Sequence, residues 1–112
     1  MDRSYAEAHH RYMTVIAHVV LRGVSKDVYD KVRAEVGWLD EHPTGGIAHL
    51  TWWEGDDNHN MDAWENEEAF GRFGDERLGP AMAKLGVESA PEVTFHQAHE
   101  VFLPKAVTLK VS

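Results

Sequence analysis

The pattern of hydrophobic and polar residues predicts a strand followed by a helix in the first third of the chain. Residues 12–23, "YMTVIAHVVLRG", are rich in β-branched side chains and close on a glycine, which is typical of a strand. Residues 24–37 then carry apolar side chains at helical spacing. Ser25 is a natural N-cap for this helix, and Gly37 suits its end.

The middle of the chain predicts a pair of strands and then a second helix. Residues 47–54 and 59–65 have the alternation of strands, and "GDDN" at 55–58 is a turn between them. Asn66 is a natural cap for the helix that follows, and Gly86 ends it. The pattern therefore continues as strand, strand, helix.

Within this second helix, Gly79–Pro80 predicts a kink or a split, because proline cannot donate a backbone hydrogen bond. A last long strand is predicted over 93–103, and residues 106–111 alternate well enough for a short extra strand. The order is that of an α+β, ferredoxin-like βαββαβ fold, an antiparallel sheet with two helices on one face. We expect a loose N-terminal arm at 1–12, one domain at 13–103, and a C-terminal extension at 104–112 that could be a swapped edge strand.

Two helices cover only one side of such a sheet, so the strands must be sorted into faces. The first strand has one purely apolar face, which we expect to meet the helices: Val15, Ala17, Val19 and Leu21. Trp52 is also expected to pack under the helices. The uncovered face is then expected to hold a mixed set of side chains: Ile16, His18, Ile47, His49, Thr51, Trp53, Asp62 and Trp64.

This uncovered face predicts a homodimer. Its isoleucines, valine and tryptophans would form an apolar patch of a size that soluble monomers rarely expose. A dimer with the two sheets facing each other would form an α/β barrel and enclose a cavity. Apolar walls with a few convergent polar groups describe a site for a small molecule.

Composition narrows the choice of partners. The net charge is −8, from 19 acidic and 11 basic residues, which disfavours nucleic acid and anionic membranes. No cysteine is present, so thiol chemistry and disulfides are excluded. No segment has the roughly 20 apolar residues of a membrane span or the pattern of a secretory signal, so we expect a cytoplasmic protein.

Three stretches resemble a known family: "GIAHL", "MDAWENEEAFGRFGDERLGPAM" and "GVESAPEVTFHQAHEVF". They are similar to the antibiotic-biosynthesis-monooxygenase-like branch of the dimeric α/β barrel superfamily, over about residues 13–103. The resemblance implies the fold and the dimer. Members of that branch include cofactor-free oxygenases of aromatic polyketides, polyketide cyclases, heme-degrading enzymes and proteins without an assigned activity.

The candidate catalytic residues are His49, Asp62 and His99. A histidine moves protons near neutral pH, and Asp62 could orient His49 or act as a base. For the last strand the alternation leaves both His96 and His99 open, and the family resemblance favours His99. Five further residues are expected to line the ligand site: His18, Trp53, Trp64, Thr51 and Ile16.

These residues leave several functions open. His49 could also be a structural interface histidine, and no spacing indicates a metal site. His42 and His59 are expected to be exposed. We expect a small-molecule enzyme that acts without a cofactor on an aromatic or polyketide-like substrate, by oxygenation or cyclisation that begins with proton abstraction. The alternatives are a binding or accessory dimer, or a heme protein, although residues 65–92 lack the axial histidine of the heme-degrading relatives.

Overall fold

The first helix begins and ends where its capping residues place it. The computed structural model describes residues 13–109 and assigns β1 to Val15–Leu21 and α2 to Lys26–Val36. The Ser25 hydroxyl accepts a hydrogen bond from the Val28 amide at 3.2 Å. Gly37 has a φ of 67°, and its amide donates to the Arg33 carbonyl at 3.0 Å.

A tight hairpin joins the next two strands, β2 (Gly46–Glu54) and β3 (Asp57–Trp64). Gly55, at the turn, has a φ of 61°, which a side-chain-bearing residue rarely adopts. The predicted turn is thus confirmed, although it is shorter than residues 55–58.

The second helix is interrupted where Gly79 and Pro80 predicted a split. It consists of α3 (Glu67–Phe73), a π-helical turn η1 (Gly74–Leu78) and α4 (Gly79–Lys84). The Gly79 amide donates to the Gly74 carbonyl, five residues earlier, which defines the wider turn. A Cβ at Gly79 would lie 2.9 Å from that carbonyl oxygen, so the turn needs glycine there.

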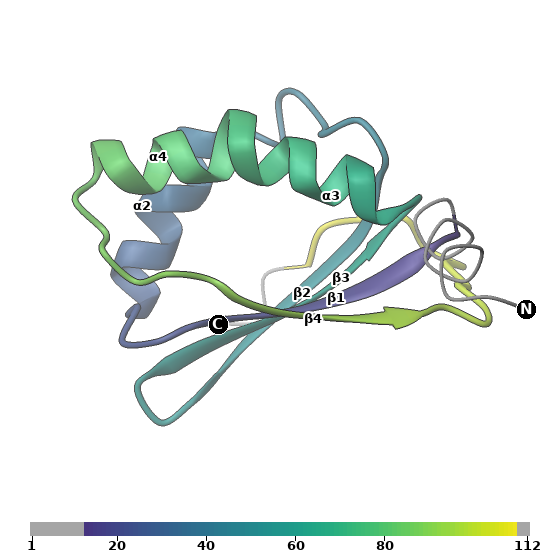
Figure 1. Cartoon of the computed structure of the whole chain (residues 1–112), viewed down its shortest axis with the longest axis horizontal. Coiled ribbons are helices and arrows are strands. Elements are labelled where there is room, and N and C mark those ends of the chain that lie inside the picture. Colours follow the sequence, from purple (N-terminus) through teal and green to yellow (C-terminus); the bar gives the residue numbers. More distant parts are fainter. Residues whose placement is uncertain (1–12, 110–112) are drawn as a thin grey trace, which may run out of the picture.

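The four strands form one antiparallel sheet in the order β2-β3-β1-β4, in which β4 is Glu92–Gln97. All the helices lie on one side of it (Figure 1). The predicted ferredoxin-like fold is therefore confirmed. Within residues 13–109, no helix is both long and apolar enough to cross a membrane.

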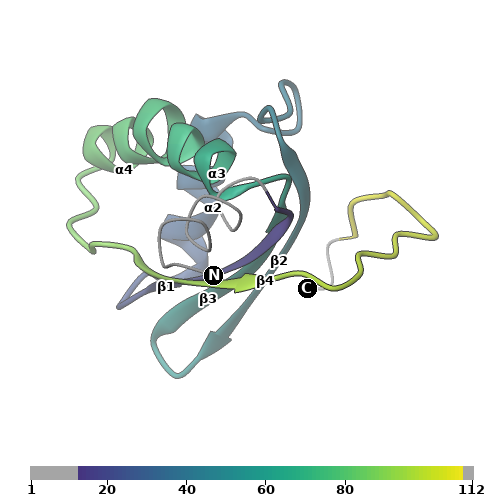
Figure 2. The ribbon, with the colours of Figure 1, turned by 45° about the vertical axis from the view of Figure 1, so that its right-hand side comes forward.

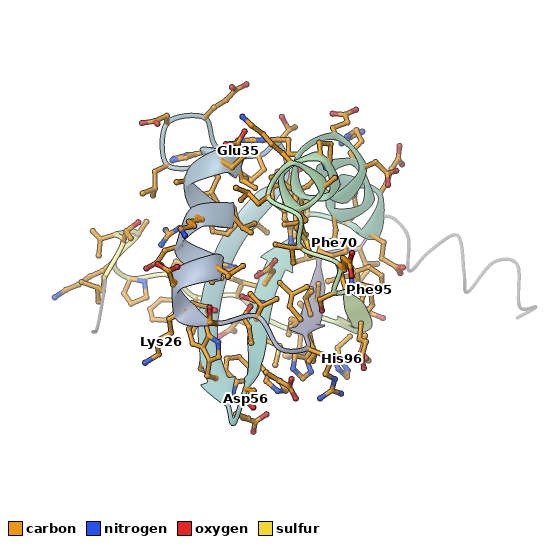
Figure 3. The ribbon with its side chains drawn as sticks, turned by 90° about the vertical axis from the view of Figure 1, so that its left-hand side faces the viewer. Lys26, Glu35, Asp56, Phe70, Phe95 and His96 are labelled. Carbon is orange, nitrogen blue, oxygen red and sulfur yellow. The ribbon has the colours of Figure 1, made fainter. Side chains whose placement is uncertain are left out.

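The core lies between the helices and the sheet. The apolar face of β1 is buried there as predicted, with Val15 and Ala17 fully shielded from solvent. On β4, Phe95 packs edge-on against Phe70 of α3, with ring centroids 5.4 Å apart, while His96 lies further from the helices (Figure 3).

The last strand is shorter than predicted. β4 ends at Gln97 rather than near residue 103, because Gln97 pairs with Val15, the first residue of β1, and little of the partner strand lies beyond it. Residues 98–109 leave the body as an irregular arm (Figure 2). Residues 106–109 form no strand within this chain, and the predicted N-terminal arm at 1–12 lies outside the described residues.

Candidate functional site

His49 is the centre of a chain of hydrogen bonds beneath the helices. Its Nδ1 lies 2.6 Å from Asp62 Oδ1, and its Nε2 lies 2.7 Å from the Tyr29 hydroxyl. The His49 and Asp62 side chains are only 16% and 7% exposed. Because the carboxylate accepts, the neutral form of this imidazole carries its proton on Nδ1 and its lone pair on Nε2.

The register of the sheet brings these groups together. His49 on β2 pairs directly with Asp62 on β3, and residues directly opposite in an antiparallel pair share a face. The other oxygen of Asp62 accepts from Trp64 Nε1 at 3.2 Å. Asp62 is therefore held at both oxygens by donors, which fixes the carboxylate and, through it, the imidazole.

Tyr29 reaches this pair from α2. Burial raises the pKa of Tyr29, an effect that the positive charge of Arg33 partly opposes. The phenol therefore stays protonated at neutral pH and donates its hydrogen to His49 Nε2. The edge of Trp53 packs against the Tyr29 ring, with centroids 5.5 Å apart, and holds it in place.

An apolar cavity of about 60 Å³ opens beside His49. This volume has room for a few water molecules and is less than half of the roughly 150 Å³ of a cavity that binds benzene. Trp38 forms part of the wall and meets His49 edge-on, with ring centroids 4.4 Å apart. The remaining lining consists mainly of aliphatic and aromatic side chains, together with Tyr29, Arg33, Asn60 and Asp62.

Asp62 and Trp64 share the face of His49 as predicted, but that face is not the one we expected. We expected these residues on the uncovered face, whereas they lie under the helices: Ala17, from the buried face of β1, pairs directly with Asp62. Polar side chains are tolerated there because they hydrogen-bond to one another. The cavity is consequently inside one chain and not between two sheets. Trp64, expected to line the ligand site, is not among the residues that line the cavity.

Ile16 and His18 are therefore not part of the site. They alternate with the buried residues of β1 and lie on the open face of the sheet. Thr51 and Trp53 do share the face of His49, yet neither lines the cavity. Trp53 instead donates its indole N–H to the Val24 carbonyl at 2.7 Å.

His99 also lies apart from the cavity. It follows the end of β4, is exposed, and is not among the lining residues. His96 pairs with Ile16 and so belongs to the open face. The geometry thus supports neither of them as a partner of His49.

The open face holds a second polar cluster that the sequence did not predict. His18 Nε2 lies 3.0 Å from His59 Nδ1, and His59 Nε2 lies 2.8 Å from Glu54 Oε2. Trp52 stacks on both imidazoles and is therefore not under the helices, as we expected. His59, expected to be exposed, is only 9% exposed because of this stack.

Sequence reasoning also missed Tyr29, Trp38 and Asn60 as site residues. Tyr29 is one of the apolar side chains at helical spacing in residues 24–37, and its phenol is the available signal, because a buried tyrosine hydroxyl usually has a partner. Trp38 lies in a loop whose path no periodicity predicts.

The heme alternative does not fit this site. Among the described residues, His49 is the one imidazole that lines the cavity, and both of its nitrogens are engaged by Asp62 and Tyr29. The cavity volume of about 60 Å³ is also far below that of a heme. Among residues 13–109, no three histidine, aspartate or glutamate side chains are grouped as a metal site would require.

A scan against models of protein families gives no match, and a search of curated proteins gives none either. Solved structures do match. A protein of unknown function from Nitrosomonas europaea is 14% identical, with a TM-score of 0.64 over 86% of this chain and 99% of that one.

Two named oxygenases have the same fold. SnoaB, a cofactor-independent oxygenase from Streptomyces nogalater solved as its N63A mutant, is 16% identical, with a TM-score of 0.56 over 84% of this chain and 99% of that one. A monooxygenase from Streptomyces coelicolor, solved with nanaomycin D, is 20% identical, with a TM-score of 0.55 over 88% and 99%. The chain therefore has the fold of the antibiotic-biosynthesis-monooxygenase-like proteins, as its sequence resemblance predicted.

Proposed function

We propose that this protein is an enzyme that removes a proton from an acidic O–H or C–H group of a small ring compound, as the first step of an oxygenation that needs no cofactor. The observation that carries the proposal is the Tyr29–His49–Asp62 chain at the wall of an apolar cavity. A buried base with a fixed tautomer beside an apolar binding space is the arrangement that general-base catalysis needs.

In this proposal His49 Nε2 is the base. The Tyr29 hydroxyl occupies its lone pair until the acidic group of the substrate takes that place. The proton then passes to Nε2, and the Asp62 carboxylate, 2.6 Å from Nδ1, stabilises the imidazolium that forms. The deprotonated ring is electron-rich and open to attack by dioxygen.

Two fold neighbours that are named as oxygenases favour oxygenation over cyclisation. The cavity volume of about 60 Å³ is too small to enclose a fused polyketide. For the assembly, we propose a homodimer formed through the open face of the sheet and the arm at residues 98–109. The arm exposes a series of large apolar side chains: Val101, Phe102, Leu103, Val107 and Leu109.

The test is oxygen uptake with a readily deprotonated single-ring substrate such as methylhydroquinone. We expect the protein to accelerate uptake above the spontaneous rate. His49→Gln should lower the enzymatic rate by about 100-fold or more, because it removes the base. His42→Gln, the same substitution at an exposed loop histidine, is the matched control and should leave the rate unchanged.

Two outcomes would contradict the proposal. One is a His49→Gln protein that is folded and fully active. The other is binding of ring compounds without turnover of any of them, which would indicate the binding protein that the sequence left open.

A further inference from the structure

The cavity beside His49 offers few hydrogen-bond partners to a molecule inside it. Both ring nitrogens of His49 are already bound, one to Asp62 and the other to Tyr29. Two further polar atoms of lining residues, Nε of Arg33 and Oδ1 of Asn60, are buried and do not open into the cavity. A water molecule in a protein interior needs roughly two to four polar partners, so this space favours an apolar occupant.

The rest of the wall consists mainly of aliphatic and aromatic side chains from several elements. Val32 and Val36 come from α2, Val19 from β1, Leu78 from η1 and Met82 from α4. Such a wall attracts an apolar molecule by dispersion but does not replace the hydration that a polar or charged group loses. The occupant that fits this lining is therefore uncharged and without strong hydrogen-bonding groups.

The volume limits the size of that occupant. The cavity has about 60 Å³, whereas a cavity that binds benzene or xenon has roughly 150 Å³. A molecule of a few heavy atoms fits, and an aromatic ring does not. Of the two reactants in the proposed oxygenation, dioxygen is the one that is both apolar and this small.

We propose that the cavity is a binding site for dioxygen beside the base. This inference rests on the proposed function and deepens it, because it places the second reactant. The ring of the organic substrate is too large for the cavity and lies outside it, with its acidic group in place of the Tyr29 hydroxyl at Nε2 of His49. Tyr29 is only partly buried, so this exchange does not require the core to open. Both reactants then adjoin one imidazole.

Dioxygen is paramagnetic, so it can be located in the protein without turnover. The relaxation rates of methyl protons are measured by nuclear magnetic resonance in protein equilibrated with dioxygen and with nitrogen at the same pressure. We expect the increase caused by dioxygen to be about threefold or more larger at Val32 and Leu78 than at Val15. Val15 is the matched control, because its side chain is fully shielded from solvent but does not line the cavity.

Val32→Ile should weaken this effect, because the added carbon occupies part of the cavity. We expect the dioxygen effect at Leu78 to fall by about half and the KM for dioxygen in the uptake assay to rise by about threefold, with the KM for the organic substrate nearly unchanged. Val28→Ile is the matched control. It makes the same change one turn earlier in α2, at a residue that packs against the core but does not line the cavity, and it should alter neither value.

A dioxygen effect as large at Val15 as at the lining methyl groups would overturn the proposal, because dioxygen would then have no preferred site. An undiminished effect at Leu78 in folded Val32→Ile protein would also overturn it. If Val32→Ile does not fold, the comparison within the wild-type protein still decides.

The failure of the proposed function has a different signature. If His49→Gln kept full activity, the proton-abstraction role would fail, while the relaxation pattern, which is measured without substrate, would still locate dioxygen. If His49→Gln abolished oxygen uptake but the relaxation pattern showed no preference for the cavity, the base would stand and the dioxygen site would fail.

Discussion

Each side chain of the candidate site has its geometry fixed by another residue. Trp64 holds one oxygen of Asp62, Asp62 holds Nδ1 of His49, and the Tyr29 hydroxyl meets Nε2. Such networks matter beyond their individual hydrogen bonds, because the low dielectric of a buried site makes each unpaired group costly. Trp64 is thus both a core residue, 1% exposed, and a positioning residue for Asp62.

Trp64→Phe separates these two roles. The ring contacts with Phe73 and Phe70 are largely kept, but the N–H to Asp62 is lost. We expect the free energy of unfolding in urea to fall by about 1–3 kcal/mol, from the smaller ring and the unpaired oxygen. We also expect kcat to fall more than KM rises, because Asp62 no longer fixes the imidazole.

Trp52→Phe is the control for this prediction, because Trp52 stacks on the open-face histidines, on the side of the sheet opposite His49. An unchanged kcat in Trp64→Phe would contradict the positioning role.

At the scale of elements, ion pairs join the ends of neighbouring strands in addition to the backbone hydrogen bonds of the sheet. Arg22, just after β1, binds Asp57 of β3 at 3.0 Å and Glu92 of β4 at 2.8 Å. The Arg22 guanidinium holds the pKa of Glu92 below its usual range. The pKa of Asp57 is lowered first by the Gly23 amide and then by Arg22. One arginine therefore links three strands, at the end of the sheet opposite the arm at residues 98–109.

Lowered carboxyl pKa values make this tie dependent on pH. Asp57 and Glu92 bind protons more weakly in the folded state than in the unfolded state. Their ion pairs with Arg22 therefore stabilise the fold above the ordinary carboxyl pKa values near 4, and this stabilisation is lost as the pH falls through the lower pKa values of the folded state. Arg22→Gln should therefore lower the urea midpoint at pH 7, and its difference from the wild type should shrink by pH 2.5.

Lys31→Gln, which breaks an exposed pair with Asp27 within α2, is the control and should have little effect at pH 7. If the urea midpoints of Arg22→Gln and the wild type differed by the same amount at pH 7 and pH 2.5, the electrostatic account would be contradicted.

At the scale of the whole molecule, one side of the sheet is covered and the other is not. The open face carries Leu50, 63% exposed, beside the histidine cluster, and the arm extends beyond it with its apolar side chains uncovered. Figure 2 shows the arm leaving the body of the chain. Burial of such apolar surfaces away from water is favourable, and a second copy of the chain carries the same exposed surfaces to pack against.

The proposed dimer is tested by sedimentation. We expect the wild-type protein to sediment with the mass of two chains and Leu50→Glu to sediment as a monomer, because the charge would be buried in the interface. Leu39→Glu is the matched control, since Leu39 is 58% exposed in the loop after α2, and it should leave the mass unchanged. A monomeric wild type would contradict the proposal.

The sequence by itself determined the order of the two helices and the four sheet strands, and the caps that bound the first helix. Local signals decide these features: Ser25 and Gly37 bound α2, Gly55 turns the hairpin, and Gly79 with Pro80 marks the break in the second helix. It also indicated that His49, Asp62 and Trp64 belong together, because alternation along two adjacent strands is enough to place them on one face.

Only the tertiary structure decided whether the face with His49, Asp62 and Trp64 lies under the helices or on the open side of the sheet. Both faces of β2 and β3 mix apolar and polar residues, so their composition favours neither side, and only the pairing of Ala17 with Asp62 places His49 under the helices. α2 packs over the same face and brings Tyr29 and Arg33 to the cavity, whereas His18 lies on the other face and outside it. A period of two assigns residues to two faces, but contacts between residues distant in sequence determine which face is covered.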